Sequence, residues 1–403
     1  MKNQELPKIA YIGWTEPSNV SGATLVLMRH LFGDNRWNVF VVTDKTFKGI
    51  GEENKWFSIK RSWLHKRLSR TRFRRIIAQY EMLLEPYLIT LKLIKLVESF
   101  EPDIIVTIPD NTLSWVAQLI AKKLNIPLVS NFQDWWPRGQ FYTPCEAPYL
   151  LTRKILENRF RQIYKDSKIA FCTSEGFRDF LGKHNCNPIL YPCPGEKPSK
   201  RPPINYIQTN EPIRLIYAGT TVRYYGQKIL SLARLIANRQ DITFHIYGGK
   251  PDWSKEDIKW AEDAGIYQGF VKHEVVKQHI ANAHIGLVVM TSAPELEIMM
   301  RTSFTTKFLE YTQLAKPVIV WGPTYCEPVR IVKQTMAGLA ITQEDPDAVI
   351  SSLSNFRNNE TLQSFSDNSW KAANTIFDAK HIQDVFSSNI DQLISTKNLR
   401  LEA

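Results

Sequence analysis

The sequence has no long apolar run and no apolar leader. Its most apolar long stretch, residues 82–100, is interrupted by Pro86, two glutamates and two lysines. A membrane-spanning helix needs about 18 or more apolar residues in succession, so the pattern predicts no such helix. Residues 1–7 lack the apolar core of a secretory signal. Both absences favour a cytoplasmic protein.

Cysteine is scarce and scattered. The chain of 403 residues has five cysteines and no CxxC pair: Cys145, Cys172, Cys186, Cys193 and Cys326. Disulfide scaffolds and zinc sites need cysteines in larger or more closely spaced sets. The histidines show no spacing typical of metal ligands either. We therefore predict a reducing compartment and no bound metal.

Acidic residues are outnumbered by basic ones. The 40 Asp and Glu stand against 51 Lys and Arg, a formal net charge of +11, which points to an anionic partner. The excess is concentrated in residues 60–75, which carry eight Lys or Arg and no acid. A solvated basic helix, a lipid-binding surface and a nucleic-acid surface all fit this stretch. We expect an anionic membrane surface as the partner, at about 1 kcal/mol per basic residue. Nucleic acid is not expected, since no zinc-finger, RRM or KH pattern accompanies the stretch.

The sequence does contain a regular alternation of β-rich apolar runs with helical segments. Predicted strands are 8–13, 37–43, 103–108, 126–132 and 169–174, followed later by 213–219, 242–247, 284–290 and 317–320. Predicted helices include 21–32, 113–124, 150–165, a segment from about 226, and 307–314. A further helical region ending at Phe100 is expected to break at Pro86. The alternation predicts an α/β protein with buried parallel strands.

A proline-rich boundary divides the alternation in two. Residues 192–212 include six prolines and no clear periodicity, which is typical of a semi-rigid linker. We predict a first domain over 1–195, a linker over 196–212 and a second domain over 213–380. A terminal helix over 381–403 is expected to pack back on the first domain.

One segment resembles a known family. TTKFLEYTQLAKPVIVWGP, residues 305–323, is similar to the donor-site segment of glycosyltransferase family 4. Other segments resemble the family in the same order over nearly the whole chain: FQDWWP at 132–137, TSEGFRDFL at 173–181, YAGTTVRYYGQ at 217–227 and GFVKHEVV at 269–276. The resemblance implies the GT-B fold, in which two Rossmann-like domains face a central cleft. It also implies retaining transfer from a nucleotide sugar without a metal. No cofactor is implied, because the nucleotide-diphosphate sugar is a co-substrate.

The resemblance assigns donor-binding roles mainly to the second domain. It implies that Glu310 holds the nucleotide ribose, while the residues alone equally fit a surface ion pair with Lys307. Gly219 would bring backbone close to the diphosphate. Val271 would lie in the turn that holds the nucleobase. Gly22 would belong to the glycine loop of the first domain, unless it serves an ordinary strand-to-helix turn.

Positive side chains are needed for the diphosphate. We predict Arg223 and Lys307 as phosphate ligands ahead of Lys228, with Arg301 as a further candidate. Thr220 stands where the family often has Arg, and Tyr225 where it often has Lys. Thr302 stands where many members have a second Glu that contacts the transferred sugar. These departures leave open whether the chain is active and which sugar it uses.

Asp134 is the candidate catalytic base of the first domain. It follows a predicted strand and precedes two tryptophans, and a carboxylate beside aromatic side chains can have a raised pKa and accept a proton. A turn-capping role fits equally well. Trp135 and Trp136 are predicted either to stack on an acceptor sugar or lipid-linked acceptor, or to pack in the core.

Together these features predict a retaining glycosyltransferase that is cytoplasmic and peripheral at the inner face of the plasma membrane. Its partners would be a nucleotide sugar and a glycan or lipid-linked acceptor, as in bacterial surface polysaccharide or glycolipid synthesis. Two alternatives stay open. One is a nucleotide-sugar epimerase or hydrolase of the same fold, and the other is a non-catalytic glycan- or lipid-binding protein.

Overall fold

The computed structural model describes residues 6–18, 22–47, 49–60, 67–68, 70–137 and 147–402. The chain divides into two compact units. Unit 1 consists of Met1–Cys193 with Ile382–Ala403, and unit 2 of Pro194–His381. Each unit is described by itself below.

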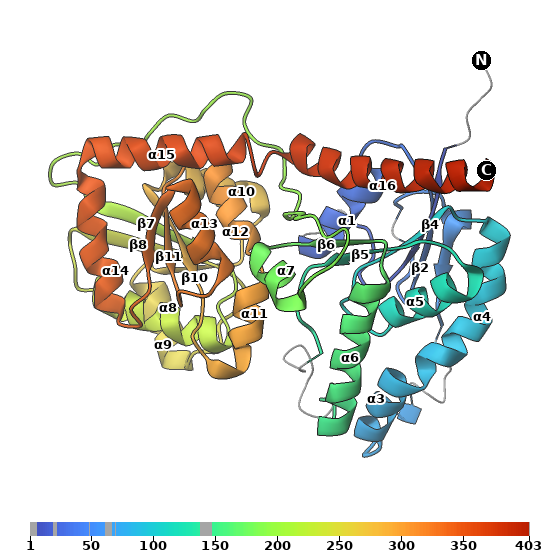
Figure 1. Ribbon diagram of the computed structural model, residues 1–403. Coiled ribbons are helices and arrows are strands. Elements are labelled where there is room, and N and C mark those ends of the chain that lie inside the picture. Colours follow the sequence, from blue (N-terminus) through green and yellow to red (C-terminus); the bar gives the residue numbers. More distant parts are fainter. Residues whose placement is uncertain are drawn as a thin grey trace. The chain divides into compact units, whose positions relative to one another are not determined.

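Unit 1 is built on a parallel sheet that has six strands in the described residues, in the order β3-β2-β1-β4-β5-β6 (Figure 1). The strands are β1 (Lys8–Ile12), β2 (Asn38–Thr43), β3 (Trp56–Ser58), β4 (Ile104–Thr107), β5 (Leu128–Phe132) and β6 (Ile169–Cys172). The side chains of β4, β5 and β6 are buried throughout. Strands buried on both faces read as continuous apolar runs, which is why the sequence reveals them.

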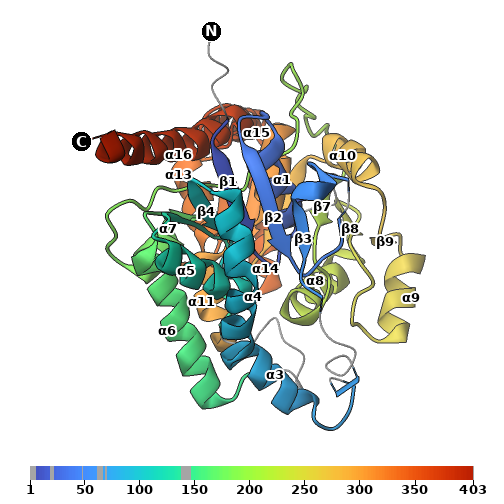
Figure 2. The same cartoon turned by 90° about the vertical axis from the view of Figure 1, so that its right-hand side faces the viewer.

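Helices cover both faces of this sheet. They are α1 (Gly22–Phe32), α3 (Arg74–Leu83), α4 (Glu85–Phe100), α5 (Leu113–Leu124), α6 (Leu150–Asp166), α7 (Glu175–Leu181) and α16 (Ala379–Glu402), with a short 3₁₀ turn at Glu53–Lys55. Helices α4, α5 and α6 lie side by side (Figures 1 and 2). The terminal helix α16 packs on α1 of the same unit, where Phe386 stacks on His30 at 4.6 Å between ring centroids.

The helical region before Phe100 is broken next to Pro86, as predicted. Helix α3 ends at Leu83, and α4 begins at Glu85 with proline in its first turn. A proline fits the first turn of a helix, where its missing N–H has no intrahelical partner to lose, whereas further inside it would break the hydrogen-bond ladder. The chain therefore starts a new helix here.

Unit 2 repeats the same architecture. In its described residues a parallel six-stranded sheet has the order β12-β11-β10-β7-β8-β9. The strands are β7 (Ile213–Ala218), β8 (Ile242–Tyr247), β9 (Tyr267–Gly269), β10 (Ile285–Val289), β11 (Val318–Trp321) and β12 (Gly338–Ile341). The helices are α8 (Arg223–Ile236), α9 (Lys255–Asp263), α10 (His273–Asn282), α11 (Glu297–Thr302), α12 (Thr306–Gln313), α13 (Glu327–Thr335), α14 (Pro346–Leu353) and α15 (Asn359–Ala373), with 3₁₀ turns at Pro294–Leu296 and Ser354–Arg357.

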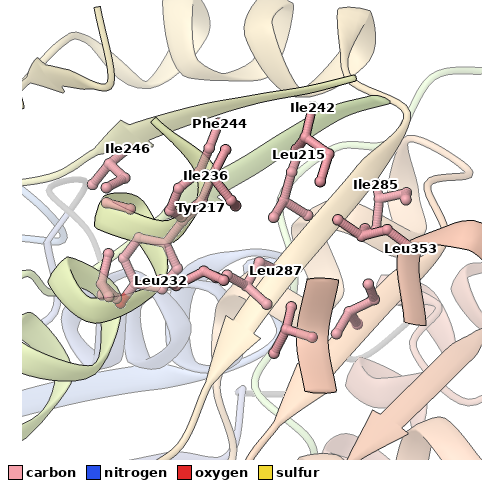
Figure 3. Packing of buried hydrophobic residues seen from close by; sticks show 14 of the residues in the cluster. Leu215, Tyr217, Leu232, Ile236, Ile242, Phe244, Ile246, Ile285, Leu287 and Leu353 are labelled. Atoms are coloured by element: carbon pink, nitrogen blue, oxygen red, sulfur yellow. The ribbon is translucent and has the colours of Figure 1, made fainter. Parts of the chain in front are cut away.

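The core of unit 2 lies between this sheet and α8. Figure 3 shows Leu215, Phe244 and Leu287 from the strands gathered with Leu232 and Ile236 from α8. All of these side chains are at most 2% exposed. Burying one such side chain contributes about 1.5–3 kcal/mol, so this cluster holds the first crossover of the unit in place.

The predicted linker is bound to unit 2 along its length. The side chain of Gln313 donates to the Gly195 carbonyl at 2.6 Å, and Lys197 forms an ion pair with Asp378 at 2.6 Å. Further along, Asn205 donates to two carbonyls of the α10 end at 2.8 and 3.1 Å. Residues 196–212 thus lie along unit 2, because their polar groups form an ion pair and hydrogen bonds with it.

The predicted fold class is confirmed: both units are α/β with parallel, Rossmann-like sheets. Three strands escaped prediction, namely β3, β9 and β12, and each has four residues or fewer. All three lie at a sheet edge and are only partly buried, so they lack the continuous apolar pattern of the similarly short β4, β6 and β11. Helix α8 also begins at Arg223, three residues before the predicted start, because the Asp252 carboxylate accepts from the Arg223 amide at 2.7 Å and caps the first turn.

Candidate functional site

Each sheet has a point where the strand order reverses direction. In unit 1 this point lies between β1 and β4, and in unit 2 between β7 and β10. Loops leaving the carboxyl ends of two such strands run to opposite faces of the sheet and leave an opening between them. Ligands of open α/β sheets bind at this position.

In unit 2 the reversal point is fixed by the hydroxyl of Tyr311. This side chain of α12 is fully buried, accepts from the Ala218 amide of β7 at 3.0 Å and donates to the Leu287 carbonyl of β10 at 3.2 Å. Burial raises the pKa of Tyr311, so the phenol stays neutral and keeps its proton to donate. The bridge locks α12, and with it Lys307 and Glu310, against the two strands that define the site.

Lys307 and Glu310 are brought together on α12. The Lys307 ammonium lies 3.2 Å from both carboxylate oxygens of Glu310, and both side chains are partly exposed. The helix opens with Thr305, whose hydroxyl accepts from the Lys307 amide at 3.4 Å. The structure thus contains the ion pair that the residues alone suggested. The pair leaves both side chains partly exposed on α12.

Hydrogen bonds fix the loop after β7, and the close approach of the Tyr217 hydroxyl explains why this loop contains a glycine. A Cβ on Gly219 would lie 2.9 Å from the Tyr217 hydroxyl. That hydroxyl donates to the Thr220 carbonyl at 2.6 Å, and the Gly219 amide donates to Tyr247 at 2.9 Å. Arg223 follows with a left-handed backbone, φ 56°, and an exposed side chain. The loop therefore presents Thr220 and Arg223 to solvent on a fixed frame.

Lys228 is placed deeper than the sequence suggested. Its ammonium donates to the Met290 carbonyl at 3.2 Å and to Glu344 at 3.0 Å, and lies 4.3 Å from the centre of the Trp321 ring. Burial lowers its pKa, and hydrogen bonding to Glu344 opposes this. Met290 and Trp321 are at the carboxyl ends of β10 and β11. Lys228 thus places a cation at the ligand edge of the sheet, one helical turn after Tyr225.

Three further candidates lie around α11, and each of them contacts a different neighbouring residue. Arg301 donates to Glu297 at 2.8 and 2.9 Å and lies over the Tyr325 ring. Tyr225 contacts the Met300 sulfur at 3.8 Å. Thr302 is fully buried and donates back to the Ile298 carbonyl at 2.8 Å. A sugar contact from position 302 would require a longer side chain than the one present.

The β9–α10 turn holds the predicted nucleobase contact. Val271 is half-buried, directly after β9 and its left-handed Gly269, φ 73°. Its neighbour Phe270 is 84% exposed, the most exposed of the large hydrophobic side chains in the described residues. An aromatic ring held out at the carboxyl end of a strand offers a flat apolar face to a planar ligand.

In unit 1 the reversal point carries a carboxylate, Asp110, that the sequence did not single out. The Thr15 hydroxyl, after β1, donates a short hydrogen bond to Asp110, after β4. Burial raises the pKa of Asp110 from 3.8 to about 7, the Thr15 hydrogen bond opposes this, and the nearby charge of Asp134 raises it further. Asp134 follows β5, so the adjacent strands β4 and β5 bring two carboxyl groups to one edge. A raised pKa beside a second carboxylate is typical of acid–base sites. In the sequence, the Asp-Asn-Thr that follows a strand was the available signal.

Of the two predicted roles of Trp135 and Trp136, stacking on an acceptor or packing in the core, the structure shows packing in the core. Their side chains are 1% and 5% exposed. The Trp135 ring packs edge-on against Phe160 and Phe180, each at 4.9 Å between centroids. Both tryptophans belong to the core because the chain turns inward after β5, where aromatic side chains of α6 and α7 already gather.

Two further predictions concern Gly22 and the absence of a bound metal. Gly22 begins α1, and residues 19–21 before it lie outside the described residues. Among the described residues, no group of three or more His, Cys, Asp or Glu is arranged to hold a metal ion. None of the described helices has the length and hydrophobicity that a membrane span requires.

Comparison with known families finds a match in the second unit. A family model described as glycosyl transferases group 1 matches residues 212–359, which lie within unit 2. This part of unit 2 is similar to group 1 glycosyltransferases. The match includes Lys228, Lys307 and Glu310 and all strands of the unit 2 sheet. By sequence, no curated protein matches the chain.

Solved structures match the chain over nearly its whole length. Sucrose-phosphate synthase from Thermosynechococcus elongatus has 13% identity and a TM-score of 0.64, over 97% of this chain and 100% of that one. Anabaena HepE, solved in complex with UDP and glucose, has 15% identity and a TM-score of 0.61, over 96% and 100%. The lipopolysaccharide outer core galactosyltransferase WaaB has 15% identity and a TM-score of 0.59, over 95% and 99%. At these identities the likeness is one of fold, and the chain has the GT-B fold of these glycosyltransferases.

Replacing Glu310 with Gln should weaken nucleotide binding. The change keeps the shape of the side chain but removes a charged acceptor, and hydrogen bonds to charged groups contribute about 1.5–3 kcal/mol. We expect calorimetry to give about a ten-fold or greater loss of affinity for a nucleoside diphosphate. Glu256→Gln, an exposed change on α9, is the control. Equal affinities of the two variants would remove Glu310 from the binding site.

The raised pKa of Asp110 predicts a pH-dependent stability. Below about pH 4 the carboxyl is protonated in both folded and unfolded chains, so it carries no penalty. Between about pH 4 and 7 the unfolded chain loses this proton first, and stability falls by up to about 1.4 kcal/mol per pH unit. Asp110→Asn should escape this loss. Its advantage in Tm over the wild type should grow up to about pH 7 and then level off; an advantage independent of pH would contradict the raised pKa.

Proposed function

We propose that the protein is a retaining glycosyltransferase that moves a sugar from a nucleotide-diphosphate donor to an acceptor hydroxyl. The observation that carries this proposal is the position of Lys307 and Glu310. They lie on α12 inside the group 1 match and are locked by Tyr311 to the reversal point of the sheet. UDP and glucose in the HepE structure, which shares the fold, support a nucleotide-sugar donor.

In the proposed reaction, unit 2 holds the donor. Glu310 accepts hydrogen bonds from the ribose hydroxyls, which displaces the Lys307 ammonium toward the diphosphate. Lys228 and Arg223 add positive charge, and Lys228 is already partly desolvated at the ligand edge. As the bond between the anomeric carbon and the phosphate oxygen breaks, the leaving nucleotide gains negative charge. Fixed cations stabilise this charge more than they stabilise the ground state, and that difference lowers the barrier.

Unit 1 supplies the acid–base group. The acceptor oxygen forms the new bond to the anomeric carbon, and its proton passes to Asp134. The neighbouring Asp110, with a pKa of about 7, is about half protonated near neutral pH. When it is protonated, Asp110 adds no negative charge beside Asp134, the proposed proton acceptor. Thr15 holds Asp110 in this position.

The acceptor is proposed to be a glycan or lipid-linked molecule of bacterial surface polysaccharide or glycolipid synthesis. The protein would then work in the cytoplasm at the inner face of the plasma membrane. Arg67, Arg70, Arg72 and Arg75 in the 60–75 stretch are exposed. Residues 61–66 and 69 of that stretch lie outside the described residues.

An assay of nucleotide-sugar turnover distinguishes the proposed glycosyltransferase from the two alternative functions. Transfer to an added acceptor is expected for a glycosyltransferase. Conversion of the donor without an acceptor would indicate an epimerase or hydrolase of the same fold. The buried Thr302 in place of a family glutamate keeps a non-catalytic glycan- or lipid-binding role as an alternative. Binding of donor without any turnover would favour that role.

Asp134→Asn should lower turnover far more than donor affinity. General acid–base catalysis contributes about 10²–10⁴-fold, and a base acts in the transition state rather than in donor binding. We expect kcat to fall by at least about 100-fold with the nucleotide Kd unchanged. Near-normal turnover would make Asp134 structural, and Asp110→Asn, assayed in parallel, would then test the neighbouring carboxyl as the base.

Turnover should survive removal of metal ions. The positive charge proposed for the diphosphate comes from Lys228, Arg223 and Lys307, helped by the amide groups at the start of α12. Activity assayed in excess EDTA should match activity in buffer within about two-fold. Loss of activity in EDTA that magnesium or manganese restores would show that a cation, and not these side chains, neutralises the leaving group.

A further inference from the structure

Large apolar side chains are exposed where α3 and α6 begin. We call this surface the α3–α6 tip. Its members are Phe73, Ile76, Tyr149, Leu150 and Leu151, which are 44, 60, 44, 68 and 70% exposed. Soluble proteins expose single apolar side chains at random, but a contiguous set marks an interaction site. In the part of unit 1 that the structure describes, these residues belong neither to the core nor to the candidate site.

The two helix starts form one surface. The side-chain oxygen of Gln79, on α3, accepts from the Tyr149 amide at 3.1 Å, and its nitrogen donates to the Ala147 carbonyl at 3.3 Å. The Arg75 guanidinium lies 4.3 Å from the centre of the Tyr149 ring. Both views of unit 1 show α3 beside α6 at the same end (Figures 1 and 2). The exposed apolar residues are therefore held together by fixed contacts.

Positive charge surrounds the tip. Arg67, Arg70, Arg72 and Arg75 precede or open α3, and Lys154 follows Leu150 and Leu151 by one turn of α6; all five are exposed. Residues 60–75 contain no acid to offset this charge. Arg72 also lies over the Phe73 ring at 5.2 Å, so charged and apolar groups are interleaved.

This combination matches one kind of occupant. A protein partner that covers an apolar tip has no general need for a positive rim, whereas an anionic bilayer offers phosphate groups directly above apolar chains. Arginine and lysine can bind the headgroups while their neighbours enter the apolar layer. Helices that lie in the membrane interface carry this arrangement of basic and bulky apolar residues.

We propose that the α3–α6 tip inserts into the membrane, so that Leu150 and Leu151 with Ile76 and Phe73 enter the boundary between headgroups and acyl chains while the surrounding arginines bind anionic lipid. The proposal deepens the membrane association proposed above, which needed charge alone. An apolar anchor differs from charge in its response to salt. At 1 M salt the screening length falls to about 3 Å, so attraction between exposed charges farther apart than this is largely removed, whereas apolar burial is not weakened.

The experiment measures co-sedimentation with vesicles of phosphatidylcholine containing phosphatidylglycerol, at low salt and at about 1 M salt. The full chain is compared with the double variant Leu150→Ser/Leu151→Ser. A matched control, Leu235→Ser/Met336→Ser, replaces two exposed apolar residues of unit 2. A third variant replaces Arg67, Arg70, Arg72 and Arg75 with Ser. Nucleoside diphosphate binding and Tm are measured for each, since exposed substitutions should change neither.

The wild type and the control should bind at low salt and keep a measurable fraction bound at high salt. Leu150→Ser/Leu151→Ser should lose about ten-fold or more in partitioning, most clearly at high salt, because two large apolar side chains no longer leave water. The arginine variant should lose most of its binding at low salt. If the double variant has a lowered Tm, Phe73→Ser/Ile76→Ser tests the same tip from α3.

Two results would overturn the proposal, and they differ. Complete release of the wild type at high salt, with equal binding of the leucine variant and the control at low salt, would leave a purely charge-based association. Absence of wild-type binding to anionic vesicles at low salt would remove the membrane association itself. Neither result bears on the proposed donor binding, because nucleoside diphosphate binding is measured separately for each variant.

Discussion

The parallel direction of the strands is the constraint on which the candidate chemistry depends. Parallel neighbours require a crossover after every strand, so each strand ends at the same edge and sends its loop there. In unit 2 that edge collects the loop of Gly219, the ammonium of Lys228 beside Met290 and Trp321, and the start of α12. In unit 1 the same edge brings Thr15, Asp110 and Asp134 together from three loops. Residues that are far apart in the chain come close together because all strands of each sheet run in the same direction.

Burial then gives these groups their chemical character. The Tyr311 hydroxyl bridges β7 and β10 because the surrounding core leaves it no water, and the raised pKa keeps its proton in place. Burial also raises the pKa of Asp110, and this favours the neutral carboxyl at a pH where an exposed one is ionised. Lys228 remains charged because the Met290 carbonyl, Glu344 and the Trp321 ring replace part of its hydration.

The α3–α6 tip is the opposite case, an apolar surface left in water. The first turns of α3 and α6 are tied together through Gln79 and the Arg75–Tyr149 contact. Those contacts hold the tip in shape while its apolar side chains stay 44–70% exposed. A protein core would satisfy such residues, and so would a bilayer. The surrounding arginines favour the bilayer.

The sequence by itself determined the alternation of strands and helices, and several predicted elements agree with the structure residue for residue, among them α5 and β8. Buried parallel strands and the helices between them have local signals: continuous apolar runs, helical spacing and a proline at a helix start. It also pointed to the 305–323 segment, because that resemblance lies in consecutive residues. Only the tertiary structure decided what surrounds each side chain. It placed Trp135 and Trp136 in the core, tied residues 196–212 to unit 2, paired Lys307 with Glu310, raised the pKa of Asp110 and left Leu150 and Leu151 in water. Each of these outcomes depends on residues distant in the chain, and local composition does not specify how such residues are brought together.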